Sequence, residues 1–237
     1  PVRLAHELRR LGAKISVLPW SEVNLVNNAP IVFSNGAVVL NGAINIPGGG
    51  TAYVDLGSDA FIGTDNYSII CSSRVKTFST SAYSSPFGVK SSSGNNTTAF
   101  YSNNATYQNI VFVDGTSIGH KYPLTQFGSV TGTQHNFVYV HRDGAEKIYC
   151  NGNLLVGTTV GVGTISGNSC LGQLSPSVTS QPFDGDIFSF VLVPGVIPEG
   201  LQRAISEDPK LAYEYQPRRI WIGTSAAPGT AALTGQG

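Results

Sequence analysis

The chain has 237 residues, with 14 Lys and Arg balanced by 14 Asp and Glu, and only 12% of its residues are charged. A neutral chain offers no global field for nucleic acid, and no apolar run in the sequence reaches the roughly 18 residues of a membrane-spanning helix. The 28 glycines and the many β-branched and turn-forming residues favour an all-β sandwich over a helical bundle or a parallel α/β fold. This length suits one large β domain with attachments, or two small domains.

The first 18 residues have the pattern of a short amphipathic helix, with apolar side chains on one stripe and basic side chains opposite. We expect this segment to be a docking arm formed by Arg3, Leu4, Leu8, Arg9, Arg10, Leu11 and Lys14. Its apolar stripe can pack on the protein's own sandwich, on a neighbouring subunit or acidic surface, or on a membrane surface. The N-terminus lacks the apolar core of a secretory signal, and removal of an initiator Met would leave Pro1-Val2, so we expect a true N-terminus.

From Ile31 onward, short strand-like runs alternate with Gly, Asn, Pro and Asp, as in a sandwich or jelly roll. The clearest unit is HNFVYVH, EKIYC and NLLVGTT, whose runs are separated by Asp143-Gly144 and Asn151-Gly152. These dipeptides favour tight hairpin turns and predict a three-stranded antiparallel meander. Both faces of the first run are apolar, as expected of a central strand: Phe137, Tyr139 and His141 alternate with Val138 and Val140.

The C-terminal part begins with a short predicted helix at Pro198-Glu199, in which Leu201, Ala204 and Ile205 share a face before Pro209 stops it. A strand-like run, LAYEYQPRRIWIG, follows, and the remaining residues are small and polar enough for a linker or disordered tail. We therefore divide the chain into an arm with linker (1–29), a domain (30–223) and a tail (224–237).

Several segments together resemble the laminin-G-like branch of the concanavalin A-like lectin/glucanase fold. They are GAVVLNGAINI, expected as the opening strand, NYSIICSSRVKTF, HNFVYVHRDGAEKIYCNGNLL, and FDGDIFSFVLVPGVIPEGLQRAISEDP. The run YEYQPRRIWIG and the final ALTGQ resemble the ends of bacteriophage and prophage structural proteins. The resemblance implies an all-β, two-sheet antiparallel jelly-roll sandwich, with a short N-terminal amphipathic helix and a short helix near the C-terminus.

Catalytic and metal-binding patterns are missing from the sequence. A glycosidase needs two carboxylates across a cleft, and the only near pair on a candidate strand is Asp184 and Asp186, which we interpret as structural, with metal binding or catalysis as alternatives. His135 and His141 lack ligand spacing, and the three cysteines, Cys71, Cys150 and Cys170, have the context of buried thiols. We therefore expect no enzyme, no cofactor, no calcium loop and no metal site.

Sugar binding fits one part of the sequence, where aromatic residues alternate with asparagines. Stacking rings and amide hydrogen bonds are the usual parts of a carbohydrate site. The candidates are Tyr101, Tyr107, Asn103 and Asn104. The alternative is that the rings pack in the core.

These patterns lead to the hypothesis of a non-enzymatic bacteriophage virion protein, assembled in the host cytoplasm, that decorates or stabilises the capsid. Its expected partners are other virion subunits, contacted through the arm, with no nucleic acid and no membrane, and a homo-oligomer, for which a trimer is a reasonable guess. The alternative is a tail or head-fibre protein that binds host surface carbohydrate, and a glycoside hydrolase is a third possibility.

Overall fold

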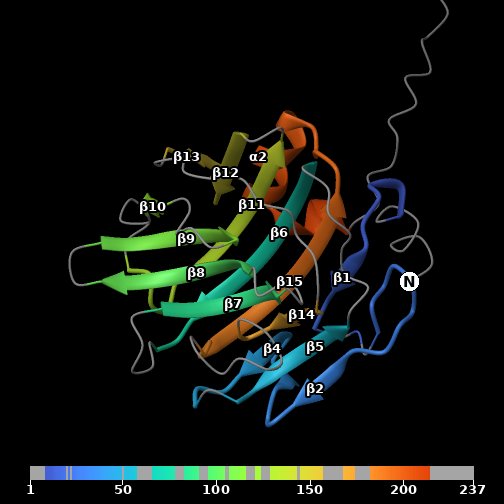
Figure 1. The fold of residues 1–237 in the computed structure, drawn as a ribbon, viewed down its shortest axis with the longest axis vertical. Coiled ribbons are helices and arrows are strands. Elements are labelled where there is room, and N and C mark those ends of the chain that lie inside the picture. The colour runs from blue at the N-terminus through green and yellow to red at the C-terminus, as the bar shows by residue number, and fades with distance from the viewer. Residues whose placement is uncertain are drawn as a thin grey trace, which may run out of the picture.

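The structure is a computed structural model of the chain (Figure 1). It describes residues 9–19, 21, 23–49, 51–57, 66–77, 83–90, 96–104, 107–115, 121–123, 129–142, 145–156, 168–173 and 182–213. Within these ranges, the strands at 96–104, 107–115 and 121–123, and residues 83, 89, 90, 146 and 168, are described by their backbone.

Two antiparallel sheets form a sandwich, as the sequence predicted (Figure 1). The first sheet contains β1 (Ile15–Val17), β3 (Val38–Leu40), β4 (Ala43–Ile46), β6 (Asn66–Val75), β11 (Gln134–Arg142), β12 (Ala145–Cys150), β13 (Asn153–Leu155) and β15 (Gly185–Pro194). Its order is β13-β12-β11-β6-β15-β4-β3, with β1 paired to β15 beside β4. The second sheet contains β2 (Val32–Ser34), β5 (Tyr53–Gly57), β7 (Tyr83–Lys90), β8 (Asn96–Asn104), β9 (Tyr107–Gly115), β10 (Lys121–Pro123) and β14 (Asn168–Leu171). Its order is β10-β9-β8-β7-β14-β5-β2.

Asn-Gly pairs make two tight turns of the first sheet in the described residues. At Asn151-Gly152 the φ angles are 48° and 80°, so both residues adopt the left-handed conformation that this hairpin turn requires. The predicted meander β11-β12-β13 is confirmed. The segment GAVVLNGAINI is not the single opening strand that we expected, because Asn41-Gly42 has φ angles of 51° and 75° and folds it into the hairpin β3-β4.

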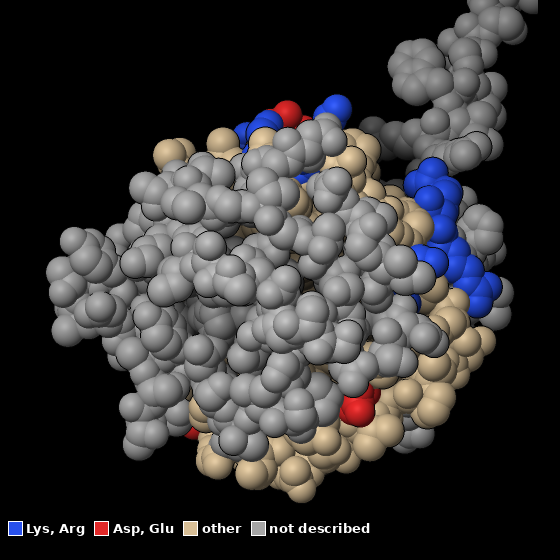
Figure 2. All heavy atoms as spheres, in the orientation of Figure 1, with Lys and Arg blue, Asp and Glu red and all other residues tan. Residues whose placement is uncertain are grey.

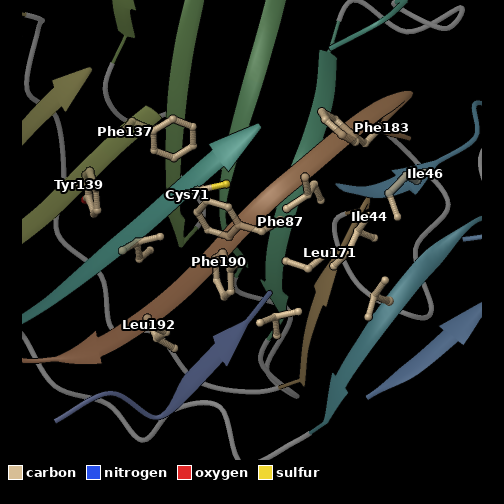
Figure 3. Packing of buried hydrophobic residues seen from close by; sticks show 14 of the residues in the cluster. Ile44, Ile46, Cys71, Phe87, Phe137, Tyr139, Leu171, Phe183, Phe190 and Leu192 are labelled. Carbon is tan, nitrogen blue, oxygen red and sulfur yellow. The ribbon is translucent and has the colours of Figure 1, made fainter. Parts of the chain in front are cut away.

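The main core lies between the two sheets (Figure 3). The rings of Phe87 in β7 and Phe190 in β15 meet across it, with centroids 5.1 Å apart and planes at 45°. Phe137 and Tyr139 of β11 are fully buried on the same side, as their alternation predicted. The other residues of that alternation, Val138 and Val140, are buried on the opposite face in a second apolar cluster. The first sheet is therefore packed on both faces.

The motif FDGDI at the start of β15 has a steric basis. A Cβ atom on Gly185 would lie 2.2 Å from the carbonyl oxygen of Arg74 and 2.7 Å from Cζ of Phe183. Both contacts are too close for any side chain. The glycine thus lets β15 approach β6 directly over the buried Phe183 ring.

The N-terminal helix is not present as we predicted it. Residues 1–8, including Arg3, Leu4 and Leu8, lie outside the described residues, and Arg9 and Arg10 are helical. Gly12, with φ of 76°, ends that geometry, and residues 15–17 form β1 against β15 instead of a further helical turn. Because Ile15 and Val17 are β-branched and both are buried in the main core, pairing in the sheet prevails over the helical periodicity.

The predicted C-terminal helix is confirmed as α2 (Glu199–Glu207), followed by the short helix η2 (Pro209–Ala212). α2 packs on β11, β12 and β13. Its buried residues are Gln202, Ile205 and Ser206, whereas Leu201, which the prediction placed on one face with Ile205, is 43% exposed. The predicted closing strand, LAYEYQPRRIWIG, does not begin at Leu211 as we expected, because Leu211 and Ala212 belong to η2. The rest of that run, from residue 214 on, and the tail 224–237 lie outside the described residues.

Candidate functional site

The face of the first sheet that points away from the second sheet, here called the outer face, has two halves. Its covered half is mainly apolar and lies under α2, η2 and the chain after β1; its apolar residues are Ile70, Val138, Val140, Val191 and Val193. Ser68 lies between Val140 and Val193 in this half, where its buried hydroxyl donates to the Gly195 carbonyl and accepts from the Ile197 N–H. Its other half, here called the open half because no described helix covers it, is polar, and its residues are Ser72, Arg74, Gln134, Asn136, Asp186 and Ser189. Of these, Ser72, Asp186 and Ser189 are buried among their neighbours. Both halves belong to the same three strands, β6, β11 and β15.

A pocket of about 390 Å³ lies where the two halves meet. Its floor comes from β6, β11 and β15, and its walls come from η2, the end of α2, the β3-β4 turn and the residue after β1. This outer pocket is lined by Leu18, Gly42, Ser72, Gln134, Asn136, Phe188, Ser189, Glu207, Asp208, Pro209, Lys210 and Tyr213. The volume falls within the ~300 to 1,000 Å³ of small-molecule sites.

Three polar side chains form a hydrogen-bonded floor. The Ser72 hydroxyl donates to Oδ1 of Asn136 at 2.6 Å, and Nε2 of Gln134 donates to Oγ of Ser72 at 2.9 Å and to Oδ1 of Asn136 at 3.0 Å. Register places Ser72 directly between Asn136 and Ser189 on its two neighbouring strands. In the described part of the chain, Oε1 of Gln134 and Nδ2 of Asn136 make no hydrogen bond, so an acceptor and a donor are available to a ligand.

An irregularity in β15 brings a ring to this floor. The register with β6 shifts between Ile187 and Ser189, so the alternation of side chains is broken there. Phe188 is the extra residue of this bulge, and its half-buried ring lines the outer pocket. Arg74 lies over the ring, with Cζ 5.5 Å from its centroid. The pocket therefore combines an aromatic surface with amide and hydroxyl groups.

Another wall of the outer pocket is formed by η2. The carboxylate of Asp208 accepts a hydrogen bond from the backbone N–H of Lys210 at 3.1 Å and so begins this helix. The side chains of Glu207 and Lys210 are exposed at the rim. Tyr213 is buried behind η2, and burial raises the pKa of its hydroxyl, so the phenol stays protonated.

A charged cluster borders the outer pocket and contains one of the predicted carboxylates. Asp186 accepts from Arg74 at 2.5 Å, from Lys76 at 2.6 Å and from Asn45 at 3.0 Å. Burial acts to raise the pKa of Asp186, but the hydrogen bonds from Lys76, Arg74 and Asn45 and the charge of Lys76 outweigh it and lower the pKa. Asp186 is therefore a buried, ionised partner of two cations, in agreement with the structural role we expected. Asp184 accepts a hydrogen bond from Thr77.

The predicted histidines and cysteines belong to the core. His135 and His141 are fully buried on the inner face of β11, where His141 meets the Tyr67 ring edge-on at 5.1 Å, and burial lowers the pKa of His135 to about 4. The three cysteines are unpaired and buried, and burial raises the pKa of Cys71 and Cys150 to about 12. In the described ranges no group of three His, Cys, Asp or Glu side chains could hold a metal ion. No helix within those ranges is long and apolar enough to cross a membrane.

The predicted carbohydrate residues lie elsewhere, in the second sheet. Tyr101, Asn103 and Asn104 are on β8 and Tyr107 is on β9, at the ends joined by the hairpin, where Asn104 pairs with Tyr107. Their side chains lie outside the described part of the structure. None of the residues that we singled out as sugar-binding in the sequence lines the outer pocket. The alternation Gln134-x-Asn136 at the start of an apolar strand is a signal for two polar groups on one face.

The predicted docking arm is only partly described. Arg9, Arg10 and Lys14 are exposed and Leu11 is half-buried. Nε of Arg9 donates to the Val26 carbonyl at 2.9 Å, and the Lys14 backbone N–H donates to the Leu192 carbonyl at 2.8 Å. These bonds attach the described end of the arm to the protein's own sandwich.

No protein-family model and no curated protein sequence matches the chain. Solved structures match its fold. Domain 4 of a GH43 extracellular arabinanase from Geobacillus stearothermophilus, in complex with arabinotriose, is similar with a TM-score of 0.59 at 14% identity, covering 85% of this chain and 98% of that domain. Trypanosoma rangeli sialidase in complex with sialic acid is similar with a TM-score of 0.63 at 12% identity over 90% of this chain, which spans only 39% of the sialidase. The CBM40 of Ruminococcus gnavus IT-sialidase, bound to α2,3 sialyllactose, has a TM-score of 0.51 at 15% identity and covers 69% and 95% of the two chains.

Proposed function

We propose that this protein is a non-catalytic carbohydrate-binding sandwich and that its glycan site is the outer pocket. One observation carries the proposal: the hydrogen-bonded floor of Ser72, Gln134 and Asn136 lies beside the half-buried ring of Phe188 in a pocket of about 390 Å³.

The floor suits a sugar because its groups are fixed and neutral. A pyranose offers an apolar face of C–H groups and a rim of hydroxyls that both donate and accept. The Phe188 ring offers an apolar surface for the C–H face of the sugar. Oε1 of Gln134 can accept a hydrogen bond from a sugar hydroxyl, and Nδ2 of Asn136 can donate one to a sugar hydroxyl. Because Ser72 and Gln134 already hold the Asn136 amide, little side-chain entropy is lost when a ligand binds.

The solved structures of similar fold support a sugar ligand in general terms. The arabinanase domain was solved with arabinotriose and the CBM40 with sialyllactose. At 14 and 15% identity these likenesses concern the fold, so the location of the site in this chain rests on its own residues.

The non-catalytic part of the proposal is supported by the state of two carboxylates, Asp186 beside the outer pocket and Asp208 in its wall. A glycosidase acid must hold a proton near neutral pH, which requires a raised pKa. The pKa of Asp186 is instead lowered by Lys76, Arg74 and Asn45, and Asp208 is engaged in capping η2. We expect no reducing-sugar release from a bound glycan. Release that Asp186→Asn abolishes would contradict this part of the proposal.

A glycan array followed by calorimetry on the best binder tests the site. Asn136→Ala and Phe188→Ala should each lower affinity at least ten-fold, about 1.4 kcal/mol. Asn153→Ala and Leu201→Ala are matched controls, because both side chains are exposed and neither lines the outer pocket. Circular dichroism should show all four variants folded.

Two results would contradict the proposal. One is a wild-type protein that binds no glycan on arrays of host and environmental polysaccharides. The other is a glycan bound equally well by Asn136→Ala and Phe188→Ala but lost in Tyr101→Ala or Tyr107→Ala, which would move the site to β8 and β9 of the second sheet.

A second candidate function is attachment to a bacteriophage particle, favoured by the basic surface of Arg9, Arg10 and Lys14. All three side chains are exposed and lie within six residues of one another in the chain, and Figure 2 shows Lys and Arg side chains gathered on one part of the surface. Charge reversal of Arg9 and Lys14 to Glu should prevent the protein from sedimenting with virions if this surface docks on acidic subunits. Deleting residues 1–18 is a poor test, since it also removes β1 from the first sheet.

A further inference from the structure

In the part of the chain that the structure describes, both sheets end on the same side of the sandwich in a strand that is paired along only one of its edges. β3 is the last strand of the first sheet and β2 the last of the second, and the short turn at Asn35-Gly36 joins them. Figure 1 shows this side, where β2, β5 and β4 lie together. An unpaired strand leaves backbone N–H and C=O groups open to another strand.

This edge is unusually apolar for a free edge. Val38, Val39 and Leu40 of β3 are 48%, 42% and 54% exposed, and Val32 of β2 is 55% exposed. These are half of the eight exposed large hydrophobic residues in the described part of the chain. The sequence from 23 to 54 contains no Asp, Glu, Lys or Arg, so the charges that usually keep a sheet edge from pairing are missing.

The hairpin geometry leaves the backbone N–H and C=O of one β3 residue, Val39, free to pair with another strand. In a two-residue hairpin the residues that flank the turn form a hydrogen-bonded pair, here Leu40 with Ala43, and the pairs alternate along the strands. The backbone of Val38 is therefore hydrogen-bonded to Asn45, whereas the backbone N–H and C=O of Val39 point away from β4, toward the open edge of the sheet. No described residue bonds to Val39 there.

We propose that β3 pairs antiparallel with β3 of a second copy of this chain and makes a two-fold dimer. With Val39 opposite Val39, the two residues exchange both N–H to O=C bonds, and Val38 of each copy faces Leu40 of the other. The strand is thus complementary to itself, apolar against apolar on both faces of the joined sheet. Two identical uncharged edges meet without like-charge repulsion, whereas a partner recognised by charge would find nothing to pair with.

The dimer has a consequence for the outer pocket that rests on the proposed function. The two-fold axis of an antiparallel strand pair runs perpendicular to the sheet, so the outer faces of both copies lie on the same side. Two pockets would then face one glycan-bearing surface, and binding would gain from the high effective concentration of the second site.

Sedimentation velocity over a concentration series tests the dimer without any glycan. The wild type should sediment as a monomer–dimer equilibrium, and Val39→Lys should weaken the dimer at least ten-fold, because it places two lysines against each other at the axis. Leu154→Lys is the matched control, since Leu154 lies on β13, the opposite edge strand of the same sheet, and is 48% exposed, close to the 42% of Val39. Hydrogen exchange should show the Val39 amide more protected at high protein concentration, and only in proteins that dimerise.

Three outcomes would overturn the proposal: a wild type that stays monomeric at ~100 μM, a dimer that Val39→Lys leaves unchanged, or a dimer that Leu154→Lys dissociates instead. Denaturation curves for both variants establish that loss of the dimer is not loss of folding. Because no ligand is present, failure here leaves the carbohydrate proposal untouched, and a glycan-binding monomer would overturn the dimer alone.

Discussion

The two halves of the outer face are built from the same strands and differ in what covers them and in the polarity of their side chains. On β11, Val138 and Val140 lie under α2 and are buried. Gln134 and Asn136 continue the same alternating row of side chains, but they lie beyond the helix and are polar. β6 makes the same change from Ile70 to Ser72 to Arg74. Sequence polarity along one face therefore follows the position of the covering helix and not the strand itself.

This difference explains why the candidate site lies where it does. A side chain that loses contact with water must be apolar or fully hydrogen-bonded, so the covered half has no group to offer a ligand. At the end of α2 the cover is incomplete, and the first open row carries hydrogen-bonding groups beside the wall made by η2. The boundary between the halves thus supplies both enclosure and polar contacts.

The largest expected effect comes from a cavity in the covered half. Ile70→Ala should lower the free energy of unfolding by about 2 to 5 kcal/mol, because Ile70 is 1% exposed and its removed atoms leave a void beneath the helical cover. Ser72→Ala, two residues further along the same outer row, should cost less than about 1 kcal/mol. Urea denaturation of both variants makes the comparison, and equal losses would show that the two halves do not differ in packing.

An intermediate effect is expected at the charged cluster. Asp186→Asn should destabilise the protein by roughly 1 to 3 kcal/mol near neutral pH, because it leaves Arg74 and Lys76 without their shared carboxylate, although both cations are partly solvated. Glu207→Gln, at the exposed rim of the outer pocket, is the control and should have almost no effect.

The stability of Asp186→Asn relative to wild type should also depend on pH, in a direction that the lowered pKa of Asp186 fixes. The pKa of Asp186 is lowered in the folded protein, so its ionised form stabilises the fold above the ordinary pKa of about 4 for an unfolded Asp, and this contribution is lost as the pH falls through the folded value. The gap in stability between wild type and Asp186→Asn should be widest near pH 7 and should close in acid. A gap that stays constant from pH 7 down to pH 2 would show that the cluster does not act through charge.

Local patterns predicted much of the sandwich from sequence. The alternation in β11 and the Asn151-Gly152 turn predicted the meander, and FDGDI predicted the start of β15. These predictions were possible because strand alternation and turn type depend on residues that are adjacent in the sequence. The helix predicted for residues 15–17 was wrong, because these residues pair with the edge of β15. The edge of a strand so distant in the sequence cannot be recognised from the local periodicity of residues 15–17.

The outer pocket could not be predicted in this way. Its floor needs the register that sets Ser72 between Asn136 and Ser189, residues 64 and 117 positions away in the chain. The Phe188 bulge has no marker in the sequence, since nothing in the run IFSFV indicates which residue is the extra one. A single polar alternation on β11 was the only local trace of the site.

The smallest effect on stability, and the sharpest on function, is expected from Gln134→Ala in the open half. Gln134 is exposed, so losing its two side-chain hydrogen bonds should change the free energy of unfolding by less than about 0.5 kcal/mol. Those bonds nevertheless hold Ser72 and Asn136 in place, and Gln134 itself lines the outer pocket. If the proposed glycan site is correct, calorimetry should show affinity reduced several-fold, less than in Asn136→Ala, while denaturation curves coincide with the wild type. Unchanged affinity, or a stability loss above 1 kcal/mol, would mean that this row serves the fold and not a ligand.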